Sequence, residues 1–180
     1  MGPGSGPACD IQLNTRLTED QRRRFQNVDT IRRVLQQTRT IAIVGLSTDP
    51  AKASQFVGTY LQHEGYRVVP VNPKATEILG EPAWPDLRSI PFPVDLVDVF
   101  RPGNVCNAIA EQAIAARVPA IWFQLRIDAL EAAELAERAG LAVVMDRCVK
   151  MEHGRWAGSL HWAGMNTEIV TARKRHRGLL

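Results

Sequence analysis

The sequence lacks the features that mark secreted, disulfide-bonded or membrane-spanning proteins. Its 180 residues contain three cysteines, Cys9, Cys106 and Cys148, and no Cys-x-x-Cys pair. An odd number of separated cysteines argues against a disulfide framework and against a structural zinc site. No apolar run approaches the roughly 20 residues that a membrane-spanning helix needs, and the first residues hold no hydrophobic segment of a signal peptide. We therefore expect a cytoplasmic protein without a membrane partner and without a bound metal.

Aromatic residues are scarce, at 6% of the chain, and the net charge is only +3. The basic residues gather near the two ends, at 22–24 with Arg32 and Arg33, and at 173–177. Such runs attract nucleic-acid phosphates, but aromatic residues that could stack on bases are not interleaved with them. We therefore interpret both runs as solvated surface and expect no nucleic-acid partner.

Short Val/Ile-rich runs alternate with amphipathic segments through the middle of the chain. Apolar residues recur at the i, i+3, i+4, i+7, i+8 spacing of a helix at Ala53, Phe56, Val57, Tyr60 and Leu61. We expect strands at 40–44, 67–71, 94–100, 119–123 and 141–145, and helices at 53–64, 104–116 and 128–139. Nearly continuous apolar strands joined by helical crossovers indicate a parallel sheet buried on both faces. The predicted fold is therefore α/β, a doubly wound, mostly parallel five-stranded Rossmann-like sheet with helices on both faces.

Turn and capping signals agree with these segments. Gly65 and Gly140 stand where a glycine follows a helix, and Asp128 is placed to cap the helix after it. Thr18 and Gln21 form a capping-box pattern that predicts the start of an earlier helix.

The expected organisation has four parts. They are a disordered leader at 1–17, an N-terminal helical segment at 18–37, the Rossmann-like domain at 38–150, and a C-terminal extension with a basic tail at 151–180. Prolines within 75–93 forbid a regular helix there. We expect Trp84 and Leu87 to pin this loop to the domain.

A strand, a glycine turn and a helix follow one another around Gly45. The run 40–44 ends at this glycine, and the hydroxyl residues Ser47 and Thr48 come before the amphipathic segment. This order aims backbone N–H groups and a helix N-terminus at a phosphate, so we expect a nucleotide-type anion after Gly45. The stretch lacks the second glycine of a P-loop, and Ser47 and Pro50 occupy the later glycine positions of a dinucleotide fingerprint.

Cations follow two successive predicted strands. NAD-binding domains place Asp or Glu after the second strand to bind the ribose 2′-hydroxyl, whereas Lys74 follows Asn72 and Pro73 here. Phe100 and Arg101 stand at the end of the third predicted strand. This charge pattern suits a highly phosphorylated nucleotide. Coenzyme A (CoA), with a pyrophosphate and a ribose 3′-phosphate, fits it better than NAD, while NADP and ATP stay open.

Five segments in order resemble the CoA-binding domain family, small Rossmann-like proteins related to the N-terminal domain of the succinyl-CoA synthetase α subunit. The matching segments are 41–48, 65–74, 94–101, 121–125 and 144–148. The segments at 151–155 and 164–167 resemble a pattern of the family's longer members. The resemblance covers the chain from about residue 38 to residue 150, at all five strand ends.

The resemblance implies a set of contacts with CoA. The expected contacts are Gly45, Leu46, Ser47 and Thr48 with the pyrophosphate, near Lys52 and Ser54 at the helix start; Asn72, Pro73 and Lys74 with the adenosine and its 3′-phosphate; and Phe100, Arg101 and Gln124 along the remaining groove. Leu46 is larger than the residue common in the family, and we expect this difference to affect the phosphate turn.

The leading hypothesis is a non-catalytic protein that binds CoA or acyl-CoA. Cys148 lies near Asp146 and His153 in sequence, and thiolate chemistry needs a nearby base, but we interpret this thiol as structural. Two alternatives stay open. One is an NAD(P)-responsive, dinucleotide-binding regulatory protein, and the other is an enzyme that uses acyl-CoA through Cys148. A homo-oligomer or a further protein partner is compatible with the sequence.

Overall fold

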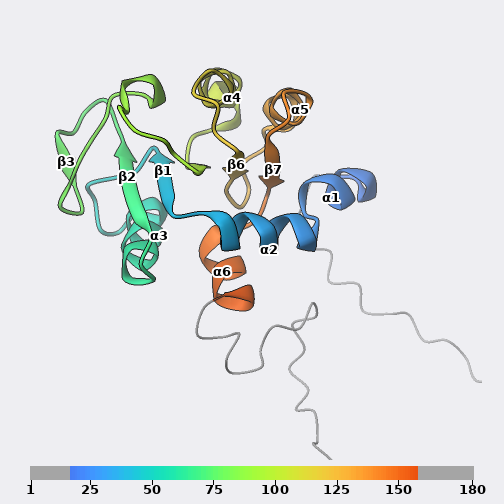
Figure 1. The fold of residues 1–180 in the computed structure, drawn as a ribbon, viewed down its shortest axis with the longest axis horizontal. Coiled ribbons are helices and arrows are strands. Elements are labelled where there is room, and N and C mark those ends of the chain that lie inside the picture. Colours follow the sequence, from blue (N-terminus) through green and yellow to red (C-terminus); the bar gives the residue numbers. More distant parts are fainter. Residues whose placement is uncertain (1–16, 158–180) are drawn as a thin grey trace, which may run out of the picture.

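A five-stranded parallel sheet forms the centre of the protein in the computed structural model, which describes residues 17–157 (Figure 1). From edge to edge the strands are β2 (Arg67–Val71), β1 (Thr40–Val44), β5 (Leu96–Val99), β6 (Ala120–Phe123) and β7 (Ala142–Met145). All four neighbouring pairs are parallel. The chain passes from β1 to β2 on one side and then to β5 on the other, so the strand order reverses beside β1. Ligands of open α/β sheets bind outside the carboxyl ends of the strands at such a reversal.

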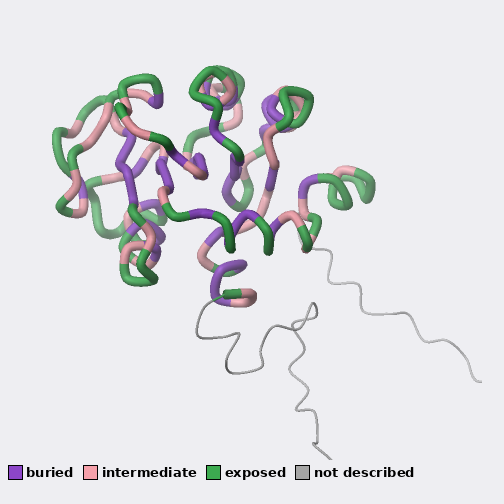
Figure 2. Tube along the Cα trace, in the orientation of Figure 1, coloured by how far each residue is buried: buried purple, intermediate pink, exposed green. Residues whose placement is uncertain are grey.

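Helices cover both faces of this sheet, which confirms the predicted fold (Figure 1). One face carries α4 (Cys106–Ala115) and α5 (Leu130–Arg138), and the other carries α2 (Val28–Gln37), α3 (Ala53–His63) and α6 (Val149–Trp156). Each face has its own apolar core, and the strands between them are buried (Figure 2). Burial on both faces explains why the strands read as Val/Ile runs rather than as alternating patterns.

The first helices pack near the β7 edge of the sheet. Helix α1 (Glu19–Phe25) begins with the predicted capping box, since Thr18 accepts a hydrogen bond from the backbone N–H of Gln21 and Gln21 reaches back to Thr18. Phe25 is buried at the end of this helix. The side chain of Gln26 then donates to the Met145 carbonyl at 3.2 Å, which ties the segment to the end of β7.

The boundaries of the later elements differ in detail from the prediction. Strands β1 and β2 match it at both ends, whereas β5, β6 and β7 are shorter than expected. Gly65 and Gly140 follow their helices with φ of 91° and 89°, as predicted. The prediction that Asp128 caps α5 was wrong. Helix α5 begins at Leu130, so its N-cap residue is Ala129, which makes no side-chain cap hydrogen bond.

The proline-containing segment after β2 forms no regular helix. It contains the short antiparallel pair β3 (Glu77–Ile78) and β4 (Glu81–Pro82) and the 3₁₀ turn η1 (Leu87–Ser89). Trp84 exchanges backbone hydrogen bonds with Pro70 and Asn72 at 2.9 and 2.8 Å, and Leu87 is buried. These contacts confirm that both residues hold the segment against the domain.

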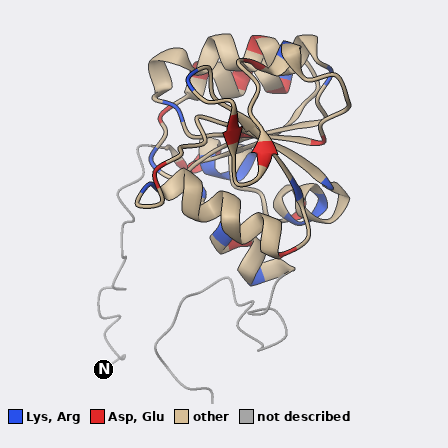
Figure 3. Cartoon of the chain, turned by 90° about the vertical axis from the view of Figure 1, so that its left-hand side faces the viewer, with Lys and Arg blue, Asp and Glu red and all other residues tan. Residues whose placement is uncertain are grey.

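Charged residues of the described part lie on its helices, its loops and some of its strands (Figure 3). Within residues 17–157, no helix combines the length and the apolar character needed to cross a membrane. Residues 1–16 of the leader predicted at 1–17, the basic run at 173–177 and the segment at 164–167 lie outside the described residues.

Candidate functional site

The turn between β1 and α3 depends on Gly45. Its φ is 89°, in the region that favours glycine. A Cβ atom at this position would lie 2.7 Å from Cδ of Arg101, so the absence of a side chain also makes room for the arginine. Gly45 therefore sets the turn and lets the Arg101 side chain cross it.

Leu46 points into the core rather than toward solvent. It is 0% exposed and belongs to the apolar core that α3 covers. Gly58 of α3 faces it, because a Cβ atom added to Gly58 would lie 3.1 Å from Cδ1 of Leu46. The size of Leu46 is thus accommodated beneath the turn, and only its backbone belongs to the turn surface.

Hydrogen bonds within the turn fix its shape. The backbone N–H of Ser47 donates to Oγ of Ser54 at 3.1 Å, and Oγ of Ser47 accepts from the N–H of Asp49 at 3.0 Å. Thr48 and Lys52 are exposed. Lys52 is the N-cap residue of α3 and makes no side-chain cap hydrogen bond. The first N–H groups of a helix have no partner within the helix, so the start of α3 is suited to an anion.

Of the three candidate residues after β2, one makes hydrogen bonds within the fold and two are exposed to solvent. Nδ2 of Asn72 donates to the Leu46 carbonyl at 2.9 Å, and Oδ1 of Asn72 accepts from the N–H of Lys74 at 2.9 Å. Asn72 therefore joins the end of β2 to the phosphate turn. Pro73 and the Lys74 side chain are exposed beside it.

A groove of about 640 Å³ runs along the carboxyl edge of the sheet between α3, α6 and the segments that follow β5 and β6. We call it the carboxyl-edge groove. Its lining includes Ala53, Phe100, Arg101, Gln124, Cys148 and Met151. The structure thus brings the predicted residues Phe100, Arg101 and Gln124 together beside the start of α3. Asn72, Pro73 and Lys74 lie outside this lining, at the end of the neighbouring strand β2.

Several groove residues were missed by sequence reasoning. Arg126 has φ of 66° and its N–H donates to Oδ1 of Asp146 at 2.7 Å. Gly103 allows the two loops of the groove to touch, since a Cβ atom there would lie 1.8 Å from the Asp128 carbonyl oxygen. Neither a positive φ at arginine nor a contact between two loops leaves a pattern in the sequence.

Helix α6 contributes to the groove because buried polar residues hold it in place. Glu152 is 3% exposed and accepts hydrogen bonds from Arg155 at 3.2 Å and from Nε1 of Trp156 at 3.0 Å. Nδ1 of His153 is 2.9 Å from the Tyr60 hydroxyl of α3. Burial lowers the pKa of the His153 imidazole below its ordinary value of 6.5. The contact between His153 and Tyr60 joins α6 to α3, and Cys148 is the N-cap residue of α6.

The arrangement of Asp146, Cys148 and His153 does not form a nucleophile with its base. Asp146 accepts the N–H of Arg126, and His153 pairs with Tyr60. Cys148 precedes α6 in an extended backbone conformation, and within residues 17–157 no hydrogen bond joins its thiol to Asp146 or His153. Among the described residues, no cluster of three or more His, Cys, Asp and Glu side chains could hold a metal ion.

A buried acid lies below the groove. Asp98 of β5 is 0% exposed, and its Oδ1 accepts a hydrogen bond from Nε2 of Gln124 at 2.8 Å. Burial raises the pKa of Asp98 to about 7, and the hydrogen bond from Gln124 opposes this shift. An acid in this position is typical of a functional site, although structural networks shift pKa values in the same way.

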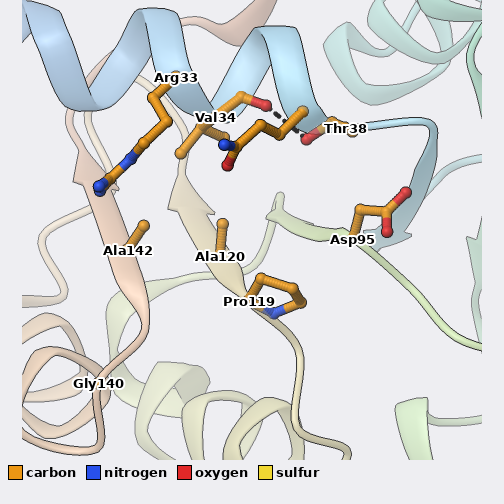
Figure 4. A pocket seen from close by; sticks show the side chains of 9 residues that line it. Arg33, Val34, Thr38, Asp95, Pro119, Ala120, Gly140 and Ala142 are labelled. Carbon is orange, nitrogen blue, oxygen red and sulfur yellow. Dashed lines mark hydrogen bonds between the residues drawn. The ribbon is translucent and has the colours of Figure 1, made fainter.

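A second hollow of about 370 Å³ lies at the opposite, amino edge of the sheet (Figure 4). We call it the amino-edge pocket. The Thr38 hydroxyl there donates to the Val34 carbonyl at 2.7 Å, and Oδ2 of Asp95 accepts from the backbone N–H groups of Arg39 and Thr40. These side chains therefore bind backbone groups of the fold itself. The amino edge is also not where ligands of such sheets bind.

Comparison with known proteins relates this geometry to a family. Residues 39–154 match the CoA binding domain family. The chain is 37% identical over 123 residues to the uncharacterized protein YneT of Bacillus subtilis, which covers 68% of this chain and 91% of that protein. A solved structure of a hypothetical protein from Pyrococcus horikoshii OT3 superposes with a TM-score of 0.71 at 37% identity, covering 73% of this chain and 92% of that chain.

A more distant relative is much longer. The chain is 28% identical over 123 residues to acetate–CoA ligase (ADP-forming) I of Archaeoglobus fulgidus. The match covers 63% of this chain but 18% of the ligase. The likeness is therefore to one segment of that protein.

Proposed function

Because the chain belongs to the CoA binding domain family, we propose that it binds CoA or acyl-CoA at the carboxyl edge of its sheet and does not itself catalyse a reaction. The observation that carries this proposal is the position of the carboxyl-edge groove. It opens beside the uncapped start of α3, at the point where the strand order reverses. Fold alone would not indicate a ligand, so the proposal depends on the charges and donors at this edge.

The parts of CoA have distinct partners in this proposal. The pyrophosphate lies against the turn of Gly45, Leu46, Ser47 and Thr48 and the start of α3, with Lys52 and Ser54 nearby. There, N–H donors and the helix dipole favour negative charge. The adenosine and its 3′-phosphate lie against Asn72, Pro73 and the exposed Lys74.

The pantetheine arm occupies the carboxyl-edge groove along Phe100, Arg101 and Gln124. Leu125 and Met151 line the same groove and are 50% and 56% exposed, so the groove offers apolar surface to an alkyl chain. Burying such surface stabilises a complex by about 25 cal/mol per Å².

Two observations support binding without catalysis. The candidate partners of Cys148 make other contacts, Asp146 with Arg126 and His153 with Tyr60. The match also covers only 18% of the acetate–CoA ligase, so the likeness to that ligase does not by itself indicate the ligase reaction.

One observation favours a second candidate, an enzyme that uses acyl-CoA through Cys148. Cys148 lines the carboxyl-edge groove and is partly exposed, so a thioester in the groove would be within its reach. The remaining alternative, an NAD(P)-responsive regulator, is disfavoured for NAD because Lys74 stands where a carboxylate would bind the ribose.

Thermal unfolding with a panel of ligands tests the proposal. CoA, acetyl-CoA, NAD, NADP and ATP are compared at equal concentrations. A ligand that binds only the folded state at one hundred times its Kd adds about 2.7 kcal/mol of stability. We expect CoA and acetyl-CoA to raise the melting temperature more than NAD does. A shift with NAD and none with CoA would favour the regulatory alternative, and a CoA-dependent turnover would favour the enzyme.

A further inference from the structure

Asp98 is an unusual residue for the middle of a parallel sheet. It stands between the buried Val97 and Val99, and all three are 0% exposed. One of its oxygens, Oδ2, has no hydrogen-bond partner among the described residues. Leaving a buried polar atom without a hydrogen-bond partner destabilises the folded state. A valine at this position would avoid that cost, so the acid calls for an explanation beyond packing.

Its position connects it to the carboxyl-edge groove. Val97 and Val99 face the core under α4 and α5, and side chains alternate along a strand. Asp98 therefore faces the side of α3 and α6, as does Trp122, its neighbour in β6. Gln124 lies two residues beyond Trp122 on the same side and lines the groove.

The hydrogen bond between the two side chains orients the amide. Nε2 of Gln124 donates to Oδ1 of Asp98 at 2.8 Å, and Gln124 is 4% exposed. Oδ1 accepts this bond whether or not the unpartnered Oδ2 carries a proton, so the NH₂ group of the amide faces the carboxyl group. No residue within 17–157 donates to Oε1 of Gln124. With Nε2 turned inward, Oε1 is the atom that remains for the groove.

We propose that Asp98 is a positioning residue that orients the Gln124 amide, so that Oε1 is presented to the carboxyl-edge groove as an acceptor for an N–H donor of the ligand. A secondary amide of a pantetheine arm is such a donor. The identity of the ligand rests on the proposed function. The orientation of Gln124 by Asp98 rests on the geometry described above.

This arrangement makes the groove selective. A freely turning glutamine would offer a donor or an acceptor to any ligand, whereas an oriented one offers an acceptor only. Fixing a group before the ligand arrives also reduces the entropy lost on binding. The effect should be confined to ligands that reach the groove, because Asp98 lies in β5 and the phosphate turn belongs to β1 and α3.

Calorimetric titration of two ligands tests the inference. CoA is compared with adenosine 3′,5′-bisphosphate, which carries the nucleotide end without the pantetheine arm. For Asp98→Leu we expect CoA to bind about three- to tenfold more weakly, as for one lost neutral hydrogen bond, with the affinity for the bisphosphate unchanged. Asp98→Asn still offers an acceptor to Gln124, so we expect it to lose no more than about twofold in CoA affinity.

A double variant separates orientation from packing. In the Asp98→Leu background, Gln124→Leu should change the CoA affinity by less than about twofold, because an unoriented glutamine contributes little. Asp98→Val, which matches the neighbouring residues, replaces Asp98→Leu if leucine does not fit the sheet. Equal losses for both ligands, or an unchanged CoA affinity in the apolar variants, would overturn the inference while leaving CoA binding intact. Failure of the unmodified protein to bind either ligand would instead contradict the proposed function.

Discussion

Leu46 and Gly58 lie against each other beneath the phosphate turn, with 3.1 Å between Cδ1 of Leu46 and the position of a Cβ atom on Gly58. This contact explains how the turn holds a residue as large as leucine. The leucine fills space that the glycine of α3 leaves open, and it is fully buried there. The Leu46 side chain therefore lies in the core and not on the surface of the turn, where we had expected it to affect the phosphate site.

This contact predicts that the two positions are energetically coupled. Gly58→Ala gains about 1 kcal/mol in helix propensity but crowds Leu46 and Leu79, and overpacking costs about 1–3 kcal/mol. We expect a net loss near 1 kcal/mol. Leu46→Ala alone should cost about 2–5 kcal/mol. The double variant should lose less than the sum by at least about 0.5 kcal/mol, measured by urea unfolding. Additive losses would mean that the contact is not tight.

Asp98 predicts a dependence of stability on pH. Its pKa is raised by burial from 3.8 to about 7, so between these values the folded chain holds a proton that the unfolded chain has released. Stability conferred by this group is present at low pH and falls as pH rises toward about 7. From about pH 5 to pH 8, the free energy of unfolding should fall by about 2–3 kcal/mol relative to the Asp98→Asn variant.

The comparison with Asp98→Asn isolates this group. The lowered pKa of His153 gives the opposite slope below 6.5, but this histidine is present in both proteins and its contribution cancels. Urea unfolding at the two pH values provides the measurement. An unchanged difference between the proteins would show that Asp98 does not titrate in this range.

Lys74 is predicted to bind the ribose 3′-phosphate. Lys74→Ala should weaken CoA more than 3′-dephospho-CoA, by roughly ten- to a hundredfold for one charge-assisted hydrogen bond. It should also reduce the salt dependence of CoA binding. Ser47→Ala should weaken both ligands equally, because they share the pyrophosphate.

A matched control for Lys74 is Arg88→Ala, which removes another exposed cation in the turn η1. This variant should bind both ligands as the unmodified protein does. Equal losses of the two ligands in Lys74→Ala would mean that the lysine does not contact the 3′-phosphate.

Cys148 is predicted to be accessible but dispensable. Cys148→Ser should change the CoA affinity by less than about threefold and the stability by less than about 0.5 kcal/mol. In a Cys9→Ser background, iodoacetamide should label Cys148 and CoA should slow the labelling. Cys106 is the internal control, because it is 0% exposed and burial raises its pKa to about 11. Loss of a CoA-dependent turnover in Cys148→Ser would instead establish the enzyme alternative.

The fold was predictable because its signals are local. Strands β1 and β2 are apolar runs bounded by residues that end them, and Gly65 and Gly140 mark helix ends through a backbone conformation that favours glycine. The prediction of Asp128 as a helix cap was wrong because it required the first residue of the helix to be known, and sequence patterns place helix ends only to within a few residues.

The candidate site was predictable only in outline. Parallel strands bring their carboxyl ends to one edge, so Phe100 and Arg101 could be placed at that edge before the structure was known, and the resemblance to the family added Gln124. The contribution of α6 and the conformation of Arg126 depend on contacts between distant segments. The pairing of Asp98 with Gln124 depends on the register of β5 and β6, which the sequence does not display.

The most direct test of the central claim is a titration of the isotope-labelled protein with CoA, followed in ¹H–¹⁵N correlation spectra. CoA binding at the carboxyl edge predicts that the amide signals that shift come from the non-proline residues of 45–54, 72–74, 100–103 and 124–127, while the signals of the amino-edge pocket at 33–38 and 140–142 do not shift. Perturbation centred on the amino-edge pocket, or unchanged spectra at millimolar CoA, would contradict the account.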